Sequence, residues 1–109
     1  MKSIFAIMST ASAYYWNQQQ ICDGFAMPTV DFEIFKDWTQ SECLSWCYAQ
    51  ERDAFPNIPY GQQMCCDYEK DTFGDVSCTL YKGNKMMTNT CLNSPVCDDT
   101  NASIIFTAS

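Results

Sequence analysis

The segment TQSECLSWCY, residues 39–48, combines a helix start signal, an amphipathic pattern and two cysteines, and the rest of the chain is organised around it. Thr39 followed by Glu42 fits a capping box, in which the hydroxyl accepts a backbone N–H of the first turn and the carboxylate reaches back to the N-cap. At about 100° per residue, the apolar residues of the segment fall on one side together with Cys43 and Cys47. The sequence therefore predicts a short helix whose buried face carries two thiols that pair with other elements.

The cysteine content indicates the compartment and the kind of scaffold. The chain has 109 residues, a length typical of one domain, and its 47% hydrophobic content is too high for a disordered chain. Eight cysteines without any histidine favour a disulfide framework in an oxidising, extracellular compartment over a metal site or a cytosolic redox enzyme. Eight cysteines allow 105 pairings, so composition leaves the connectivity open. The expected bridging residues are Cys22, Cys43, Cys47, Cys65, Cys66, Cys78, Cys91 and Cys97.

The charge of the chain argues against several partners. The formal net charge is -7 and the isoelectric point is near 4.1, whereas binding to nucleic-acid phosphates needs clustered lysine and arginine. The acidic residues are dispersed, as on a solvated surface that keeps a secreted protein in solution. No stretch approaches the ~20 apolar residues of a membrane span. We therefore expect neither a nucleic-acid partner nor a membrane span.

The two ends of the chain differ in character from its middle. Residues 1–13 have a positive start, a short apolar run and a small-x-small end, which predicts a secretory signal cleaved before Tyr14, with a structural N-terminal arm as the alternative. Residues 14–98 contain all the cysteines and form the expected disulfide-rich domain. Residues 99–109 are expected to be a C-terminal tail, in which Ile104-Ile105-Phe106 suits an edge strand or a contact with another chain.

Period-two patterns predict the strands. Val30, Phe32 and Ile34 alternate with acidic residues, as in a strand that buries the apolar side. Residues 62–68 and 76–81 predict a hairpin. With one helix, these elements predict an α+β fold, a small disulfide-rich domain with the helix packed on an antiparallel sheet.

Adjacent cysteines constrain the first strand of this hairpin. Successive side chains of a strand point to opposite faces of the sheet. Cys65 and Cys66 should therefore be bridged to different elements.

Three cysteine-bearing segments resemble those of a PAN/Apple-type domain. These segments are the helix with Cys43 and Cys47, the strand Cys65-Cys66-x-Tyr68 and the strand Cys78-Thr79-Leu80-Tyr81, and the resemblance covers roughly residues 22 to 91. It implies a secreted module that binds protein or carbohydrate.

The same resemblance implies a pairing of the cysteines. In that family the helix cysteines bridge to the sheet, which implies Cys43 with Cys78 and Cys47 with Cys65 or Cys66. An outer bridge joins the ends, which implies Cys22 with Cys91 or Cys97. The doubled Cys65-Cys66 and the additional tail cysteine depart from the family pattern and leave the fourth bridge open.

Residues that could support catalysis or metal binding are few. Without histidine, a Ser-His or Cys-His pair is excluded, and oxidised cysteines are not nucleophiles. The run from Asp67 to Asp71 imitates the start of an EF-hand, but Thr72 and Cys78 stand where glycine and glutamate are required. The spacings of the cysteines also lack zinc knuckles. We expect no enzyme, no metal and no cofactor, and we interpret the four clustered carboxylates as a solvated hairpin turn: Asp67, Glu69, Asp71 and Asp75.

Exposed aromatic residues are the candidate contacts for an extracellular protein or glycan. The candidate contacts are Tyr14, Tyr15, Trp16 and Tyr60. For the first three, the alternative is packing against the body of the domain. Asn101-Ala102-Ser103 is an N-glycosylation sequon, which favours a surface loop.

Three functions are compatible with these features. The first is a non-catalytic extracellular recognition or adhesion module. The second is a self-assembling subunit of an extracellular fibre or coat, joined through the terminal segments at residues 4–8 and 104–106. The third is a diffusible, pheromone-like cysteine-rich signal.

Overall fold

The computed structural model describes Trp16, residues 20–89 and residues 100–109. The expected signal or arm at residues 1–13, the contact candidates Tyr14 and Tyr15, and the cysteines Cys91 and Cys97 lie outside these residues. The elements in chain order are β1 (Gln20–Cys22), β2 (Thr29–Lys36), α2 (Gln40–Asp53), β3 (Gln63–Lys70), β4 (Asp75–Lys82), β5 (Met86–Thr88) and β6 (Asn101–Thr107).

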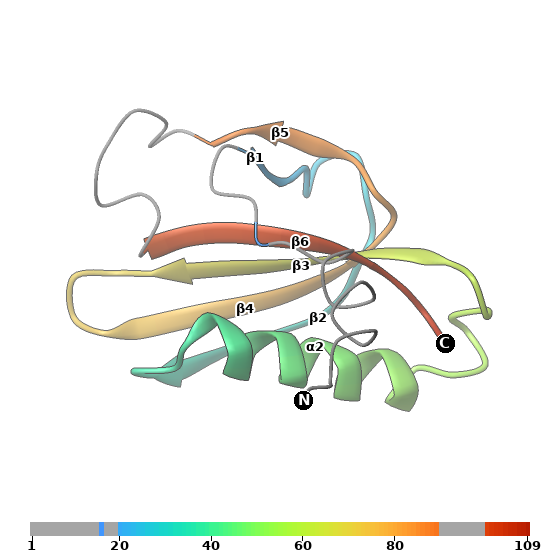
Figure 1. Ribbon diagram of the computed structural model, residues 1–109, viewed down its shortest axis with the longest axis horizontal. Coiled ribbons are helices and arrows are strands. Elements are labelled where there is room, and N and C mark those ends of the chain that lie inside the picture. The colour runs from blue at the N-terminus through green and yellow to red at the C-terminus, as the bar shows by residue number, and fades with distance from the viewer. Residues whose placement is uncertain (1–15, 17–19, 90–99) are drawn as a thin grey trace, which may run out of the picture.

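The strands form a four-stranded sheet in the order β2-β4-β3-β6 and a two-stranded sheet of β1 and β5, and every pairing is antiparallel. Figure 1 shows α2 on one side of the larger sheet and the β1–β5 pair on the other. Over the described residues the molecule is therefore a small disulfide-rich α+β domain with one helix packed on an antiparallel sheet, as the sequence predicts.

The helix α2 begins where the capping box predicts. Thr39 Oγ1 accepts the backbone N–H of Glu42 at 3.2 Å, and the Glu42 carboxylate accepts the backbone N–H of Thr39 at 2.8 Å. The helix continues past the predicted end to Asp53, and its buried face includes Cys43 and Cys47. In the part of the chain that the structure describes, no helix has the length and apolar character that crossing a bilayer requires.

The main core lies between α2 and the sheet. One face of the sheet supplies the largest fully buried side chains, from all strands except β2: Met64, Val76, Leu80, Ile104 and Phe106. Tyr48 of α2 meets Phe106 edge to face, with ring centroids 4.8 Å apart. The helix is thus held to the sheet by apolar burial as well as by its cysteines.

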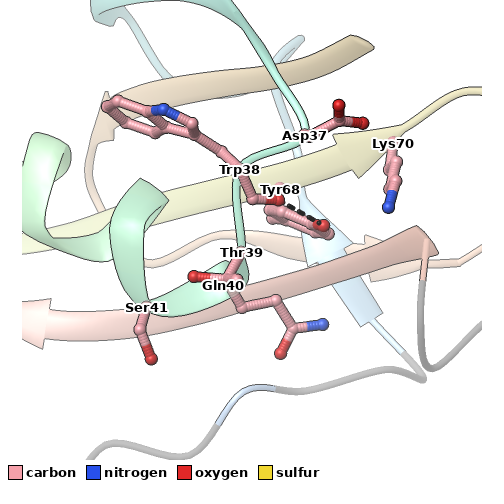
Figure 2. A pocket seen from close by; sticks show the side chains of 7 residues that line it. All are labelled: Asp37, Trp38, Thr39, Gln40, Ser41, Tyr68 and Lys70. Carbon is pink, nitrogen blue, oxygen red and sulfur yellow. Dashed lines mark hydrogen bonds between the residues drawn. The ribbon is translucent and has the colours of Figure 1, made fainter. Parts of the chain in front are cut away.

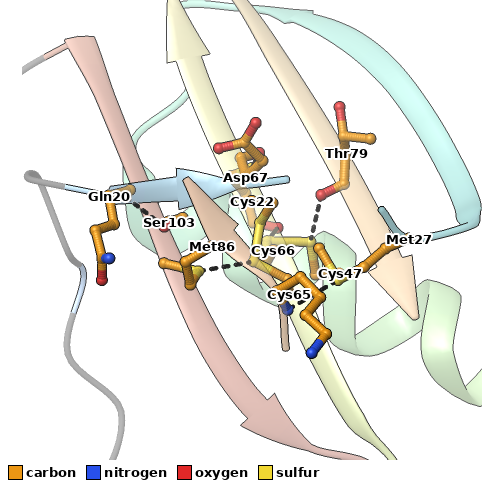
Figure 3. Close-up of a disulfide and its surroundings, with 12 residues drawn as sticks. Gln20, Cys22, Met27, Cys47, Cys65, Cys66, Asp67, Thr79, Met86 and Ser103 are labelled. Carbon is orange, nitrogen blue, oxygen red and sulfur yellow. Dashed lines mark hydrogen bonds between the residues drawn. A yellow bond between two sulfur atoms is a disulfide. The ribbon is translucent and has the colours of Figure 1, made fainter. Parts of the chain in front are cut away.

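Within the described residues, three disulfides connect the elements. Cys43–Cys78 joins α2 to β4, and Cys47–Cys66 joins α2 to β3, so both helix cysteines bridge to the sheet. Cys22–Cys65 joins β1 to β3 on the opposite face (Figure 3).

The adjacent cysteines of β3 therefore serve opposite faces, as expected. The pairing of Cys22 with Cys91 or Cys97 was wrong, because β1 lies over the second face of the sheet and brings Cys22 to Cys65, with Cα atoms 6.0 Å apart.

The expected orientation of β2 was also wrong. A bulge between Thr29 and Asp31 shifts its register against β4. One extra residue reverses the face to which every later side chain points. Val30 packs against the main core, whereas Phe32 and Ile34 lie on the face away from α2 and are 52% and 56% exposed.

The expected C-terminal tail, residues 99–109, contains a strand of the domain, because Asn101–Thr107 form β6, which pairs with β3 along its length. Ile104 and Phe106 belong to the main core, and Ile105 packs against Cys22 and Cys65 on the other face. β6 is an edge strand of the larger sheet, which confirms the first of the two roles expected for residues 104–106. Its apolar side chains are nevertheless committed to the interior, which leaves them unavailable for joining another chain.

Candidate recognition site at the helix N terminus and the hairpin tip

A groove of about 650 Å³ lies where α2 begins, beside the end of β3. One wall is the connection from β2 into the first turn of α2, and the other is β3 (Figure 2). The lining residues are Asp37, Trp38, Thr39, Gln40, Ser41, Tyr68 and Lys70. Most of them are polar or charged, so the groove suits a ligand with hydrogen-bonding groups.

The aromatic residues of the groove hold its walls together. Tyr68 donates its hydroxyl to the backbone carbonyl of Trp38 at 3.0 Å, which ties the end of β3 to the helix entry. The indole of Trp38 stacks on Phe35, with centroids 3.5 Å apart and planes 2° from parallel. In Figure 2 this indole points away from Lys70. The groove therefore offers charged side chains, Asp37 and Lys70, rather than an open aromatic face.

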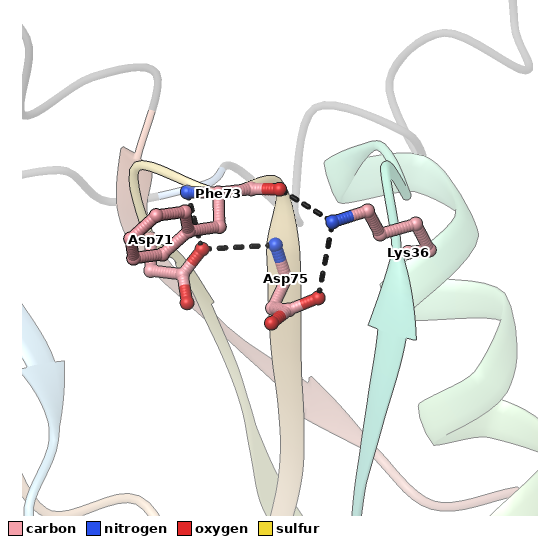
Figure 4. A network of polar contacts seen from close by, with 4 residues as sticks. All are labelled: Lys36, Asp71, Phe73 and Asp75. Atoms are coloured by element: carbon pink, nitrogen blue, oxygen red, sulfur yellow. Dashed lines mark hydrogen bonds and ion pairs between the residues drawn. The ribbon is translucent and has the colours of Figure 1, made fainter.

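The β3–β4 turn, called here the hairpin tip (residues 71–75), is held by its own polar groups. Asp71 Oδ1 accepts the backbone N–H groups of Phe73 and Asp75 at 2.8 and 2.9 Å. Lys36 donates to the Phe73 carbonyl and pairs with Asp75 at 3.4 Å (Figure 4). Gly74 adopts φ 89°, a left-handed conformation that glycine allows.

The hairpin tip presents one large apolar side chain to solvent. Phe73 is 78% exposed although the backbone on both sides of it is fixed. The tip adjoins the groove, because Asp37 donates its backbone N–H to the Gly74 carbonyl at 2.8 Å. The groove and Phe73 together form the candidate site.

The clustered carboxylates do not converge on a shared centre. Asp67 and Glu69 lie in β3 rather than in a turn, whereas Asp71 and Asp75 lie at the hairpin tip. Asp67 is only 8% exposed and faces away from the groove, and its Oδ1 has no hydrogen-bond partner among the described residues. Burial, with a contribution from Glu69, raises its pKa from 3.8 to about 7.

A second ionisable group on this face responds to the same surroundings. Burial raises the pKa of Tyr81, and the negative charges of Asp67 and Glu69 raise it further. Among the described residues on this face of the sheet, the negative charge of one acidic group therefore makes ionisation of its neighbour less favourable.

One cysteine cluster has the geometry of a metal site. The sulfur atoms of Cys43, Cys47 and Cys66 lie within 4.8 Å of one another, the only such cluster of metal-ligating side chains in the described residues. All three belong to disulfides, and a disulfide sulfur is not the thiolate that a metal requires. In the oxidised protein this cluster is a structural part of the core.

Of the predicted contact residues, the structure describes Trp16 and Tyr60, and neither is an exposed part of the groove. Trp16 is half-buried and meets Tyr68 edge to face, with ring centroids 6.2 Å apart. It therefore packs against the body of the domain, which was the alternative to a contact role. Tyr60 is well exposed but precedes the start of β3, whereas the groove lies at the end of that strand. Sequence reasoning missed Asp37, Lys70 and Phe73. The local signal for Phe73 is Asp71 followed by Gly74, a pairing typical of tight turns.

The sequon lies in a strand rather than in a surface loop. Asn101 is the first residue of β6 and is half-buried. Ser103 is fully buried and donates its hydroxyl to the Gln20 carbonyl at 2.8 Å, which links β6 to β1 (Figure 3). The serine therefore has a structural role that is independent of a glycan.

In comparisons with known proteins, no protein-family model, no curated protein and no solved structure matches the chain.

Proposed function

We propose that this chain is a non-catalytic extracellular recognition module and that its ligand is a protein. The observation that carries the proposal is Phe73, a large apolar side chain that is 78% exposed on a hydrogen-bonded turn beside a groove. Aromatic side chains dominate binding energy in protein interfaces, and a rigid support lowers the entropy lost on binding.

The lining of the groove favours a protein over a carbohydrate. Within the groove, Tyr68 is buried and one face of the Trp38 indole stacks on Phe35, so the groove lining offers little aromatic surface on which a sugar ring can stack. Asp37 and Lys70 offer charges of both signs, which suit the mixed charges of a protein surface.

The disulfides support the proposal of an extracellular module. Three bridges are typical of a small domain in an oxidising compartment. The bridges of Cys43 and Cys47 run from the helix to the sheet, as the resemblance implies. The bridge between Cys22 and Cys65 departs from it.

The variant Phe73→Ser tests this proposal. We expect the labelled domain to bind cells of its source organism, and the variant to bind about tenfold more weakly because an interface anchor is lost. Affinity is measured by flow cytometry over a concentration series. The matched control is Phe25→Ser, which removes a side chain that is 97% exposed in the β1–β2 connection.

Two outcomes would contradict the proposal. Equal effects of both variants would show that Phe73 is not an anchor. Binding that survives protease treatment of the cells but is lost after glycosidase treatment would identify a carbohydrate ligand instead.

Self-assembly into a fibre or coat is the second candidate, and the outer edge of β2 is an edge of the larger sheet at which a second copy would pair. Among the described strands β2 pairs only with β4, and it exposes Phe32 and Ile34. Light scattering at high concentration distinguishes the two functions, because a strictly monomeric chain excludes assembly. A diffusible signal would use the same site as the recognition module, and a cellular response to the purified protein would identify it.

A further inference from the structure

The outer edge of β2 presents backbone groups that the sheet does not use. In an antiparallel ladder, alternate residues direct both their N–H and their C=O groups to the same side. Phe32 donates its N–H to the carboxylate of Asp31 at 2.8 Å rather than to β4. By alternation, Phe32 and Ile34 direct their backbone groups away from β4, and such an edge can pair with another strand.

The side chains along this edge differ in character between the two faces of the sheet. Phe32 and Ile34 lie on the face away from α2 and are exposed. Asp31 and Glu33 occupy the alternate positions, on the other face. Lys36 is tethered to the hairpin tip, so its charge is already paired with Asp75. The edge is thus apolar on one face and acidic on the other.

Charge decides which occupant fits this edge. A second copy of the chain would bring its own Asp31 and Glu33 to the same edge, and both copies carry a net charge of -7. Like charges on paired strands are destabilising. A strand with basic side chains would instead neutralise Asp31 and Glu33.

We infer that the outer edge of β2 accepts an extended segment of a partner protein as an additional strand. This segment carries basic side chains opposite Asp31 and Glu33 and aliphatic side chains opposite Phe32 and Ile34. Backbone hydrogen bonds supply affinity and the alternation supplies specificity. The bulge between Thr29 and Asp31 ends regular pairing, so the segment spans the part of β2 from residue 31 to residue 36. The inference rests on the proposed function, because it names the partner chemistry of a protein-recognition module.

Two synthetic peptides test the inference, one alternating lysine with valine and one alternating glutamate with valine. We expect the wild-type chain to bind the lysine peptide and hydrogen exchange at the Ile34 amide to slow on binding, as measured by NMR. Glu33→Lys should weaken binding of the lysine peptide roughly fivefold and strengthen binding of the glutamate peptide, because one cross-strand attraction becomes a repulsion. The matched control is Asp53→Lys, which makes the same charge change at an exposed position at the end of α2.

Three results would overturn the inference. Equal weakening by Glu33→Lys and Asp53→Lys would mean that only net charge attracts the peptide. Unchanged exchange at the Ile34 amide would mean that the peptide binds elsewhere. Protection of that amide without peptide, together with dimers in light scattering, would mean that a second copy occupies the edge.

The cell-binding experiment separates this inference from the proposed function. If Phe73→Ser weakens cell binding but neither peptide binds at β2, the inference about the β2 edge is wrong and the proposed function stands. If the lysine peptide binds at β2 but cell binding does not depend on Phe73, the candidate site at the hairpin tip is wrong.

Discussion

Replacing Asp67 by asparagine will stabilise the protein at neutral pH and have little effect near pH 4. The folded state holds this carboxyl with a pKa of about 7, against 3.8 for the ordinary value that applies in the unfolded chain. Below about pH 4 both states are protonated and the full stability is present. Between about pH 4 and pH 7 the unfolded chain releases the proton while the folded chain retains it, so stability falls as the pH rises.

The size of this effect follows from linkage. A pKa displaced from 3.8 to about 7 corresponds to at most roughly 4 kcal/mol. Asparagine is uncharged at every pH, so Asp67→Asn should remove this slope. The measurement is the free energy of unfolding in urea at a series of pH values from about 4 to about 8.

The control for Asp67→Asn is Asp53→Asn, at an exposed position. This control should keep the slope of the wild-type chain. If Asp67→Asn keeps that slope as well, the buried carboxyl is not its cause.

Replacing both Cys43 and Cys78 by alanine will cost about 4 kcal/mol of stability, because their sequence separation of 35 makes the closed loop long. Their bridge also holds α2 against β4 in the middle of the core, where both residues are fully buried. Since small domains are stable by only about 5–15 kcal/mol, this loss should be visible as a large drop in the midpoint of denaturant unfolding. Circular dichroism during denaturation measures it.

The bridge between Cys22 and Cys65 is the matched comparison, because its sequence separation of 43 predicts a similar entropic cost. Replacing this pair by alanine should release the β1–β5 sheet locally, because that sheet packs through a small separate cluster. Hydrogen exchange should then show loss of protection in β1 and β5 while the larger sheet stays protected. Loss of protection across both sheets would contradict this division of roles.

Local sequence signals predicted the start of α2 and the opposite faces of the two cysteines in β3. The capping box of Thr39 and Glu42 acts within one helical turn, so it is readable from the sequence and is confirmed by the hydrogen bonds. The opposite directions of Cys65 and Cys66 follow from the strand period alone. These features require no knowledge of which elements meet in space.

Features that depend on distant contacts were not predictable in this way. The bulge near Val30 reversed the faces of Phe32 and Ile34, and a period-two pattern carries no sign of it. β1 and β5 each have three residues, too few to show alternation. Without β1 over the second face, no local feature assigns Cys22 to Cys65.

The candidate site also depends on distant contacts. Asp37 lies between β2 and α2, whereas Lys70 ends β3, and only folding brings them to one groove. The hairpin tip was partly readable, because Asp71 and Gly74 are turn-forming residues. The backbone at Phe73 is held in part by Lys36, which is far away in the sequence and donates to the Phe73 carbonyl.

A photo-reactive phenylalanine analogue at position 73 tests whether the hairpin tip contacts a protein ligand. The analogue is placed in turn at position 73 and at position 25, and each labelled domain is irradiated on cells and analysed by mass spectrometry. We expect a cross-linked protein that forms from position 73 and is reduced by excess unlabelled domain. Cross-linking that is equal from both positions, or that does not respond to unlabelled domain, would contradict it.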